Sequence, residues 1–202
     1  MAPRPAVLPL TRDASLVILA GGRSTRMGRA KAELPVGELT LLEWMVRRLG
    51  PRFAETIVSG ATAPAGARTV DDRRADAGPL AGIEAALVAA RTDVAFVVAC
   101  DMPRASERLA GLLVSRCAGH DVAVPRVGNR AQPTCAAYAR SAVPKLAAYL
   151  DAGGRRATAA LDALDAVFLE EGDLADAGIP LSELADLDTP ADYQAFLASL
   201  GD

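Results

Sequence analysis

Near the start of the chain, a pair of glycines is followed by a cluster of positively charged residues. Gly21 and Gly22 come directly after the apolar run 16–20, and the next ten residues contain four cations: Arg23, Arg26, Arg29 and Lys31. Backbone N–H groups can approach an anion closely only where side chains are absent, and nearby Arg and Lys side chains neutralise its charge. The segment therefore predicts a loop that binds phosphate groups.

Acidic residues follow two later segments at the points where predicted strands end. Asp71 and Asp72 come after residues 67–70, and Asp101 comes after the apolar run 94–100. Open α/β sheets bind ligands beyond the carboxyl ends of their strands, so we expect these acids and the glycine loop to share one edge. Carboxylates that hold Mg²⁺ beside cations that hold phosphates are typical of a nucleoside triphosphate site. Of the adjacent acids, Asp71 is the one we expect to function.

The glycine loop matches neither of the two common nucleotide-binding fingerprints. A P-loop needs Gly-Lys-Ser/Thr, but Lys31 stands between Ala30 and Ala32. The dinucleotide pattern GxGxxG is absent, because Gly21 and Gly22 are adjacent and the next glycine is Gly28. Ordinary P-loop hydrolysis and hydride transfer are therefore disfavoured.

Apolar periodicity and turn residues predict strands that alternate with helices. Residues 15–20 are apolar at consecutive positions, which is typical of a central parallel strand covered on both faces. Residues 126–132 are expected to form a polar loop. The alternation predicts a three-layer α/β/α sandwich with a mostly parallel sheet. Further strands are expected at 56–58, 67–70, 94–100, 121–124, 134–138 and 166–169, and helices at about 41–49, 78–91, 106–117, 143–150, 157–164 and from 190 onward.

Length and composition narrow the possible classes of protein. The 202 residues suit a single domain over 15–202, preceded by a flexible tail over 1–14 that contains three prolines. A net charge of −3 argues against nucleic-acid binding, which needs a basic face. No segment approaches the roughly 20 apolar residues that span a bilayer. The three cysteines show no CxxC spacing, so a reducing cytoplasm is the simpler expectation.

Several motifs, in order along the chain, resemble one known family. LAGGRSTRMGRAK at 19–31 is similar to the LAGGxSxRMGxxK signature of the molybdenum cofactor guanylyltransferases (MobA-type), which have the Rossmann-like nucleotidyltransferase fold. GPLAG at 78–82 and CDMP at 100–103 also resemble segments of that family. Gln-Pro-Thr at 132–134 and Asp-Thr-Pro at 188–190 are supporting matches, so the resemblance covers nearly the whole chain.

The resemblance implies transfer of GMP from GTP to the phosphate of molybdopterin, with release of pyrophosphate and with Mg²⁺ as cofactor. Arg26, Lys31 and Asp101 would be catalytic, and Asp101 and Asp188 would hold the metal ion. These residues suit the reaction, because in-line transfer of this kind depends on holding the substrates in position and on neutralising phosphate charge. It does not need a covalent nucleophile on the protein. Matching positions would bind the nucleotide: Leu19, Ala20, Gly21, Gly22, Arg26, Lys31, Ser59, Asp71, Leu80, Gly82 and Asp101.

Some residues depart from the family pattern and leave more than one function open. Ala30 and Ser59 stand where the family often has Asp and Asn. Asp186 and Asp188 replace the usual Asn-x-Asn, and the acidic form also occurs in cytidylyl relatives. A cytidylyltransferase acting on the same acceptor is therefore an alternative, although Gly21–Gly22 and GPLAG favour guanine. The sequence is also compatible with an inactive nucleotide-binding adaptor for molybdoenzyme maturation proteins, and with an enzyme that uses another phosphorylated acceptor.

Four further residues carry chemically active side chains. Arg155 and Arg156 follow a glycine pair and either bind the anionic acceptor, together with Asp188, or form a charge pair at a helix end. Cys100 precedes Asp101 and is better interpreted as a small buried hydrophobe than as a nucleophile. His120 is the single histidine and is expected to be a loop residue without a catalytic role.

Overall fold

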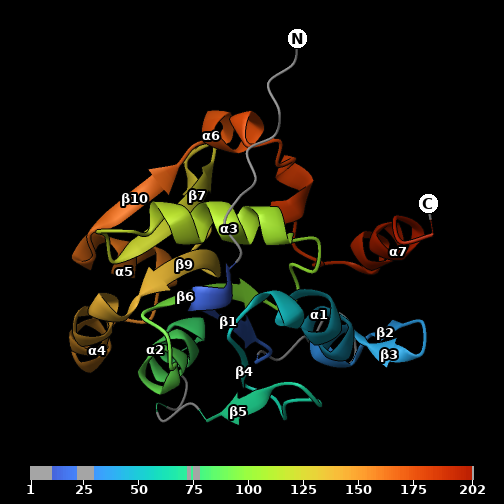
Figure 1. Cartoon of the computed structure of the whole chain (residues 1–202), viewed down its shortest axis with the longest axis horizontal. Coiled ribbons are helices and arrows are strands. Elements are labelled where there is room, and N and C mark those ends of the chain that lie inside the picture. Colours follow the sequence, from blue (N-terminus) through green and yellow to red (C-terminus); the bar gives the residue numbers. More distant parts are fainter. Residues whose placement is uncertain (1–10, 22–29, 72–73, 75–77, 202) are drawn as a thin grey trace.

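The structure is a computed structural model that describes residues 11–21, 30–71, 74 and 78–201. Its main sheet has the strand order β10-β7-β9-β6-β1-β4-β5, and β8 pairs with β7 (Figure 1). The pairs β1–β4, β1–β6, β4–β5 and β7–β10 are parallel, whereas β9 is antiparallel to both its neighbours. The strands are β1 (Ala14–Leu19), β4 (Glu55–Ser59), β5 (Arg68–Val70), β6 (Val94–Ala99), β7 (Val122–Val127), β8 (Arg130–Ala131), β9 (Cys135–Ala139) and β10 (Ala166–Leu169).

Helices cover both faces of this sheet, and alternate residues of β1 belong to the two sides. Leu16 and Ile18 pack with α1 and α3, while Val17 and Leu19 pack with α2 and α4. All of β1 is buried, as expected for a central strand. The predicted three-layer α/β/α sandwich with a mostly parallel sheet is confirmed. The helices are α1 (Leu41–Leu49), α2 (Pro79–Ala89), α3 (Glu107–Arg116), α4 (Val143–Asp151), α5 (Ala157–Ala160), α6 (Glu171–Asp176) and α7 (Pro190–Ala198).

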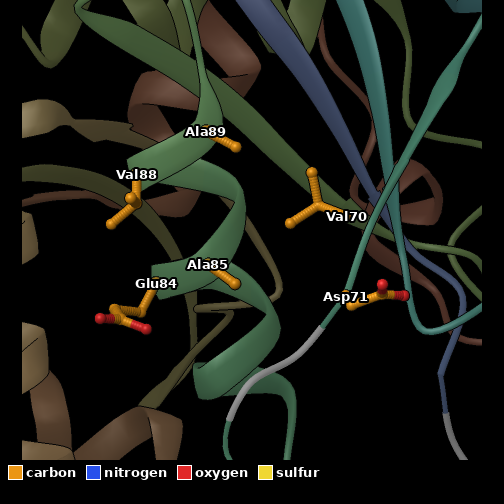
Figure 2. Close-up of a pocket in the computed structure, with 6 residues that line it drawn as sticks. All are labelled: Val70, Asp71, Glu84, Ala85, Val88 and Ala89. Carbon is orange, nitrogen blue, oxygen red and sulfur yellow. The ribbon is translucent and has the colours of Figure 1, made fainter.

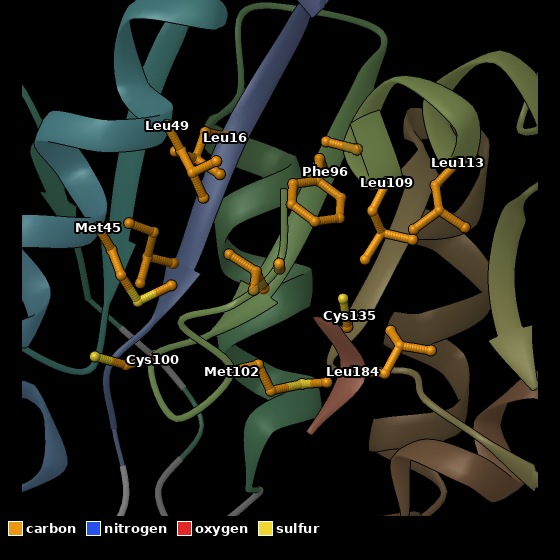
Figure 3. Close-up of a cluster of buried hydrophobic side chains, with 14 of the residues drawn as sticks. Leu16, Met45, Leu49, Phe96, Cys100, Met102, Leu109, Leu113, Cys135 and Leu184 are labelled. Carbon is orange, nitrogen blue, oxygen red and sulfur yellow. The ribbon is translucent and has the colours of Figure 1, made fainter. Parts of the chain in front are cut away.

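The larger apolar cluster lies between the sheet and helices α1 and α3. Leu16 and Phe96 of the sheet face Met45 and Leu49 of α1 and Leu109 of α3 (Figure 3). These side chains are fully or almost fully buried. Truncating a buried Phe or Leu to Ala typically lowers the free energy of unfolding by about 2–5 kcal/mol, so this cluster is a main source of stability.

Local signals explain where the helices begin. Thr40 caps α1 in a reciprocal capping box with Glu43, and Thr189 caps α7 in the same way with Asp192. Pro79 and Pro190 lie in the first turns of α2 and α7, where the missing N–H has no intrahelical acceptor to lose. Helix α7 lies beside the small hairpin β2 (Pro35–Val36) and β3 (Leu39–Thr40), and the Tyr193 hydroxyl donates a hydrogen bond to the Pro35 carbonyl.

Some elements differ from the expectations. The prediction of a polar loop over 126–132 is wrong, because β7 continues to Val127 and the chain returns as β8. Pro125 has no N–H for a strand ladder, but its carbonyl accepts from the Gln132 amide at 3.0 Å, so β7 changes partner from β9 to β8 there. The helix expected at 157–164 is short, with α5 followed by a 3₁₀ turn at Leu161–Ala163. Helix α6 and the β2–β3 hairpin were not predicted.

The start of the described chain is also structured. Residues Thr11–Asp13, assigned above to the tail, form a 3₁₀ turn, and the buried Thr11 hydroxyl donates to the Arg52 carbonyl at 2.8 Å. Residues 1–10 lie outside the described residues. No helix in the described part of the chain is long and apolar enough to cross a membrane.

Candidate active site

The carboxyl end of β1 lies between the ends of its two parallel neighbours. The Ala20 amide donates to the Ser59 carbonyl at the end of β4 (2.8 Å), and the Cys100 amide after β6 donates to the Leu19 carbonyl (2.9 Å). These bonds continue the sheet one residue beyond its strands. They place Gly21, Gly60 and Asp101 at the same edge, as the parallel arrangement predicts.

Gly21 and Gly60 approach each other backbone to backbone. A Cβ atom on Gly60 would lie 2.5 Å from both the Cα and the N of Gly21, closer than real Cβ atoms come. Gly60 also has φ of +87°, a conformation that L side chains rarely adopt. The missing side chains therefore let two strand ends close together at the start of the glycine loop. Gly60 was not among the predicted site residues, although the Ser-Gly end of its strand was a signal for a turn.

The first turn of α2 packs directly against β1 and β4. A Cβ atom on Gly82 would lie 2.7 Å from Ser59 Oγ and 3.4 Å from a side-chain carbon of Leu19. The side chains of Leu19, Ser59 and Leu80 are buried. Four of the predicted nucleotide-binding residues thus come together, with their side chains mainly in packing contacts beneath the edge.

Lys31 joins two carboxylates from distant parts of the chain. Its Nζ lies 2.8 Å from Asp101 Oδ2 and 3.0 Å from Asp188 Oδ1. The side chains of Lys31 and Asp101 keep only 19% and 28% of their exposure, so water screens this pair less than a surface ion pair. Burial lowers the pKa of Lys31, but hydrogen bonds and charge from Asp101 and Asp188 outweigh this effect and raise it. The ammonium group is therefore charged at neutral pH.

A third acid lies close to this group. Burial raises the pKa of Asp186, and the negative charges of Asp101 and Asp188 raise it further, whereas Arg130 and Lys31 act in the opposite direction. The charges of the three acids and Lys31 thus influence one another. Because the acids outnumber the lysine, binding of a further cation here is electrostatically favourable.

Backbone contacts hold the segments that carry these acids. The Leu187 amide donates to the Asp101 carbonyl at 2.7 Å, and Leu187 itself is fully buried. Met102, next to Asp101, is also fully buried, in the cluster that contains Leu184 (Figure 3). Asp101 and Asp188 therefore stand on segments that are joined to each other and anchored in the core.

Asp71 lies at the same edge but apart from the Lys31 group. It follows β5, which β4 and β1 separate from β6, so roughly 14 Å of sheet lies between the two acids. Asp71 and Val70 line a cavity of about 370 Å³ against α2 (Figure 2). The Asp71 side chain points away from the helix in this view, and the α2 residues that line the cavity are Glu84, Ala85, Val88 and Ala89.

The two arginines after α4 lie near the start of α2. Arg155 Nη1 donates to the carbonyls of Leu150 (3.2 Å) and Gly154 (2.7 Å), which caps the end of α4. Its own carbonyl would lie 3.8 Å from a Cβ on Gly78. Arg155 thus contacts the end of α4, as the helix-end interpretation expects, and both Arg155 and Arg156 are exposed to solvent.

Cys100 and His120 take no part in the Lys31 group. Burial raises the pKa of the Cys100 thiol to about 12, which removes it as a nucleophile at neutral pH and agrees with its interpretation as a buried hydrophobe. The exposed His120 ring lies 3.2 Å from Asp165 Oδ2, away from the Lys31 group. Gly22 and Arg26, together with Arg23 and Arg29, lie outside the described residues.

Comparison with known proteins identifies the family. The family model described as the MobA-like NTP transferase domain matches residues 16–167, which is most of the chain and includes Lys31 and Asp101. The chain belongs to the MobA-like NTP transferase family. The resemblance seen in the sequence motifs is thereby confirmed.

Named relatives of this MobA-like chain agree. A "Probable molybdenum cofactor guanylyltransferase" of Pelotomaculum thermopropionicum is 44% identical over 135 residues, which cover 65% of this chain and 66% of that protein. A "Molybdenum cofactor guanylyltransferase" of Serratia proteamaculans is 34% identical, over 74% of this chain and 80% of that protein. These names support a transferase within the nucleotidyltransferase family.

Solved structures show the same fold as this MobA-like chain. Molybdopterin-guanine dinucleotide biosynthesis protein A from Archaeoglobus fulgidus aligns with a TM-score of 0.80 at 24% identity, covering 93% of this chain and 98% of that one. The 2-C-methyl-D-erythritol 4-phosphate cytidylyltransferase of Thermus thermophilus aligns with a TM-score of 0.70 at 20% identity, covering 94% and 99%. The predicted nucleotidyltransferase fold is thus confirmed.

Proposed function

We propose that this protein transfers GMP from GTP to the phosphate of molybdopterin and releases pyrophosphate. The observation that carries the proposal is the contact of Lys31 with both Asp101 and Asp188, at the sheet edge where Gly21 begins the glycine loop. Cations and carboxylates side by side provide what a triphosphate and its counter-ion need. The guanylyltransferase names of the relatives support GTP and molybdopterin as the substrates.

In this proposal, the triphosphate lies along the glycine loop. Lys31 and Arg26 contact its phosphates, and the backbone of Leu19, Ala20, Gly21 and Gly22 lines the nucleotide. Gly82, Leu80 and Ser59 shape the nucleoside end, with Asp71 beyond them. Arg155, Arg156 and Asp188 face the acceptor.

The residues present fit a divalent metal ion. Asp101 and Asp188 already direct one oxygen each at a single cationic centre, the Lys31 ammonium. Magnesium prefers oxygen ligands and is commonly held by one or two carboxylates together with substrate phosphates and water. Among the described residues, no cluster of three or more His, Cys, Asp or Glu side chains is placed to hold a metal ion. In this proposal the nucleotide phosphates and water would therefore supply the remaining ligands. When bound, Mg²⁺ would neutralise charge that develops on the phosphates.

The reaction needs no covalent intermediate on the protein. A phosphate oxygen of the acceptor attacks the α-phosphorus of GTP, the bond from that phosphorus to the bridging oxygen of the β-phosphate breaks, and pyrophosphate leaves. Lys31 and Arg26 stabilise the negative charge on the departing oxygens, and the glycine loop holds the chain of phosphates in line. Because no protein nucleophile is needed, the unreactive thiol of Cys100 beside Asp101 is consistent with this mechanism.

The test is turnover with defined substrates. Purified protein is incubated with Mg²⁺, molybdopterin and either GTP or CTP, and pyrophosphate release is followed. We expect release with GTP that depends on both the acceptor and Mg²⁺, and its loss in Asp101→Asn. Absence of release with both nucleotides in the wild type would contradict an enzymatic role.

A cytidylyltransferase is a second candidate, favoured by the acidic residues Asp186 and Asp188. In the same assay it would release pyrophosphate faster with CTP than with GTP at equal concentration. That result would overturn the guanylyl proposal while leaving the site and the reaction class in place.

A further inference from the structure

Arg48, on α1, binds the loop that follows Asp101. Its Nη2 donates hydrogen bonds to the Pro103 carbonyl at 2.6 Å and to the Ala105 carbonyl at 2.5 Å. Both carbonyls belong to the short connection between β6 and α3. The guanidinium therefore ties the last turn of α1 to the loop that carries Asp101.

The surroundings of Arg48 are unusual for an arginine. The guanidinium lies over the Trp44 ring, 4.7 Å from its centroid. Its Nε is buried and has no hydrogen-bond partner in the part of the chain that the structure describes. Burial lowers the pKa of Arg48, and the charges of Glu183 and Glu107 partly oppose this. Burying a charged group with an unpaired N–H is unfavourable, so the hydrogen bonds from Nη2 to the Pro103 and Ala105 carbonyls must offset that cost.

The same loop is also tied to the segment that carries Asp188. Leu187 donates to the Asp101 carbonyl at 2.7 Å, and the Ser106 amide donates to Glu183 Oε2 at 3.0 Å. Trp44, beneath Arg48, packs edge to face on Phe196 of α7, with ring centroids 5.3 Å apart. Helix α1, the Asp101 loop and the segment from Glu183 to α7 therefore form one connected unit around Arg48.

We infer that Arg48 is a positioning residue for nucleotide transfer, which fixes the 101–106 loop so that Asp101 and Asp188 stay aimed at one cation. The inference rests on the proposed function. Arg48 touches neither carboxylate and acts through the backbone of their loops. Its effect is therefore on the geometry of cation binding and on the rate of transfer, and the affinity for GTP alone stays close to that of the wild type.

Two substitutions and one control separate this role from general stability. Arg48→Met keeps an unbranched chain over Trp44 but leaves two carbonyls without their donor. Arg48→Lys keeps the charge and restores a donor. Arg52→Met is the matched control. Arg52 lies in the 3₁₀ turn that follows α1, its side chain is half exposed, and it pairs with Glu107 at 2.6 Å.

The readouts are kcat, the KM for GTP, and Mn²⁺ binding in the presence of GTP, followed by electron paramagnetic resonance. We expect Arg48→Met to lower kcat and weaken Mn²⁺ binding by about tenfold each, since small displacements of catalytic groups have effects of that size or larger. KM for GTP should change little. Arg48→Lys should recover most of both losses, and Arg52→Met should stay within about twofold of wild type.

Two results would overturn the inference. One is a folded Arg48→Met protein with unchanged kcat and Mn²⁺ affinity. The other is a loss in Arg48→Lys or Arg52→Met equal to that in Arg48→Met. Should Arg48→Met not fold, Arg48→Gln takes its place, because its shorter, uncharged side chain also loses the contacts with the Pro103 and Ala105 carbonyls. A folded Arg48→Gln protein with weaker Mn²⁺ binding than Arg52→Met supports the inference, and equal binding contradicts it. The Mn²⁺ readout needs no turnover, so wild type that binds Mn²⁺ and GTP without releasing pyrophosphate would refute the proposed function separately.

Discussion

The ammonium of Lys31 lies 2.8 Å from the carboxylate of Asp101, a residue 70 positions away in the chain. Lys31 reaches this place from the turn after the glycine loop, and Asp101 reaches it from the end of β6. Because β1 and β6 are parallel neighbours, their carboxyl ends meet at the same edge. The sheet itself therefore creates the pairing of opposite charges on which the proposed chemistry depends.

Removing the Lys31 charge tests its part in transfer. We predict that Lys31→Met lowers kcat/KM for GTP by about 100-fold, because a cation that stabilises charge on the phosphates is lost while the Asp101 and Asp188 carboxylates are left without it. Steady-state pyrophosphate release measures the effect. Lys145→Met is the control, since Lys145 pairs with Asp121 at the opposite edge of the sheet. Equal losses in both variants, after correction for the folded fraction, would argue against a role of Lys31 in the site.

Adding a side chain at Gly60 tests the close approach to Gly21. Gly60→Ala should lower the free energy of unfolding by about 3 kcal/mol or more, because the strained φ adds to a backbone clash. Gly119→Ala is the matched control: its φ is +83°, but nothing lies within 4 Å of the new Cβ. Its free energy of unfolding should fall by only about 1–2 kcal/mol, the cost of placing an L residue at a positive φ. Urea unfolding gives both values, and equal losses would mean that the Gly21 contact is unimportant.

Gly82 offers a similar test with a second-site rescue. Gly82→Ala should destabilise the protein even though Ala normally favours a helix, since its Cβ would lie 2.7 Å from Ser59 Oγ. Combining it with Ser59→Ala removes that oxygen and should recover much of the loss in thermal unfolding temperature. Gly172→Ala, on α6 with open space around the position, should not destabilise. A double variant no more stable than Gly82→Ala alone would show that the strain lies elsewhere.

Asp121 should make stability depend on pH. This buried carboxylate accepts from Lys145 (2.5 Å), Ser141 (2.6 Å) and the Asp165 amide (2.9 Å). Burial alone would raise its pKa, but these partners lower it below the ordinary 3.8. The ionised form therefore stabilises the fold above about pH 3.8, and that contribution is lost as the pH falls through the lower folded value.

The corresponding substitution is Asp121→Asn. We predict that it lowers the free energy of unfolding by about 2 kcal/mol at pH 7, since it weakens hydrogen bonds to a buried charge. The difference from wild type should shrink as the pH is brought below 3.8. Urea titrations at pH 7 and pH 3 provide the comparison, and a difference that does not change with pH would be the contrary result.

Much of the edge could be predicted because parallel strands impose it. Once residues 15–20 and 94–100 are recognised as buried strands, the glycine loop and Asp101 must lie near each other. The Asp71 position follows in the same way. What this reasoning cannot give is which side chains then meet, because that depends on how loops fold back over the edge.

The contacts that were missed are of this second kind. The family resemblance placed Asp188 beside Asp101, but it did not give the contact between Asp188 and Lys31, which lies 157 residues earlier. The hydrogen bond from the Leu187 amide to the Asp101 carbonyl holds that segment in place. The partners of Arg48 are backbone carbonyls, which carry no signature in the sequence. The extension of β7 past Pro125 was also not predicted, because a proline normally ends a strand. Here β7 continues by pairing with a new partner, β8.

Competition between GTP and CTP for the acceptor tests the proposed transfer of GMP most directly. Wild type and Asp101→Asn are each given molybdopterin, Mg²⁺ and equal concentrations of GTP and CTP, and the dinucleotide product is identified by mass spectrometry. We expect the guanine dinucleotide as the main product of the wild type and none from Asp101→Asn. A cytosine dinucleotide as the main product would rule out the guanylyl assignment, and equal product from Asp101→Asn would rule out the role of Asp101.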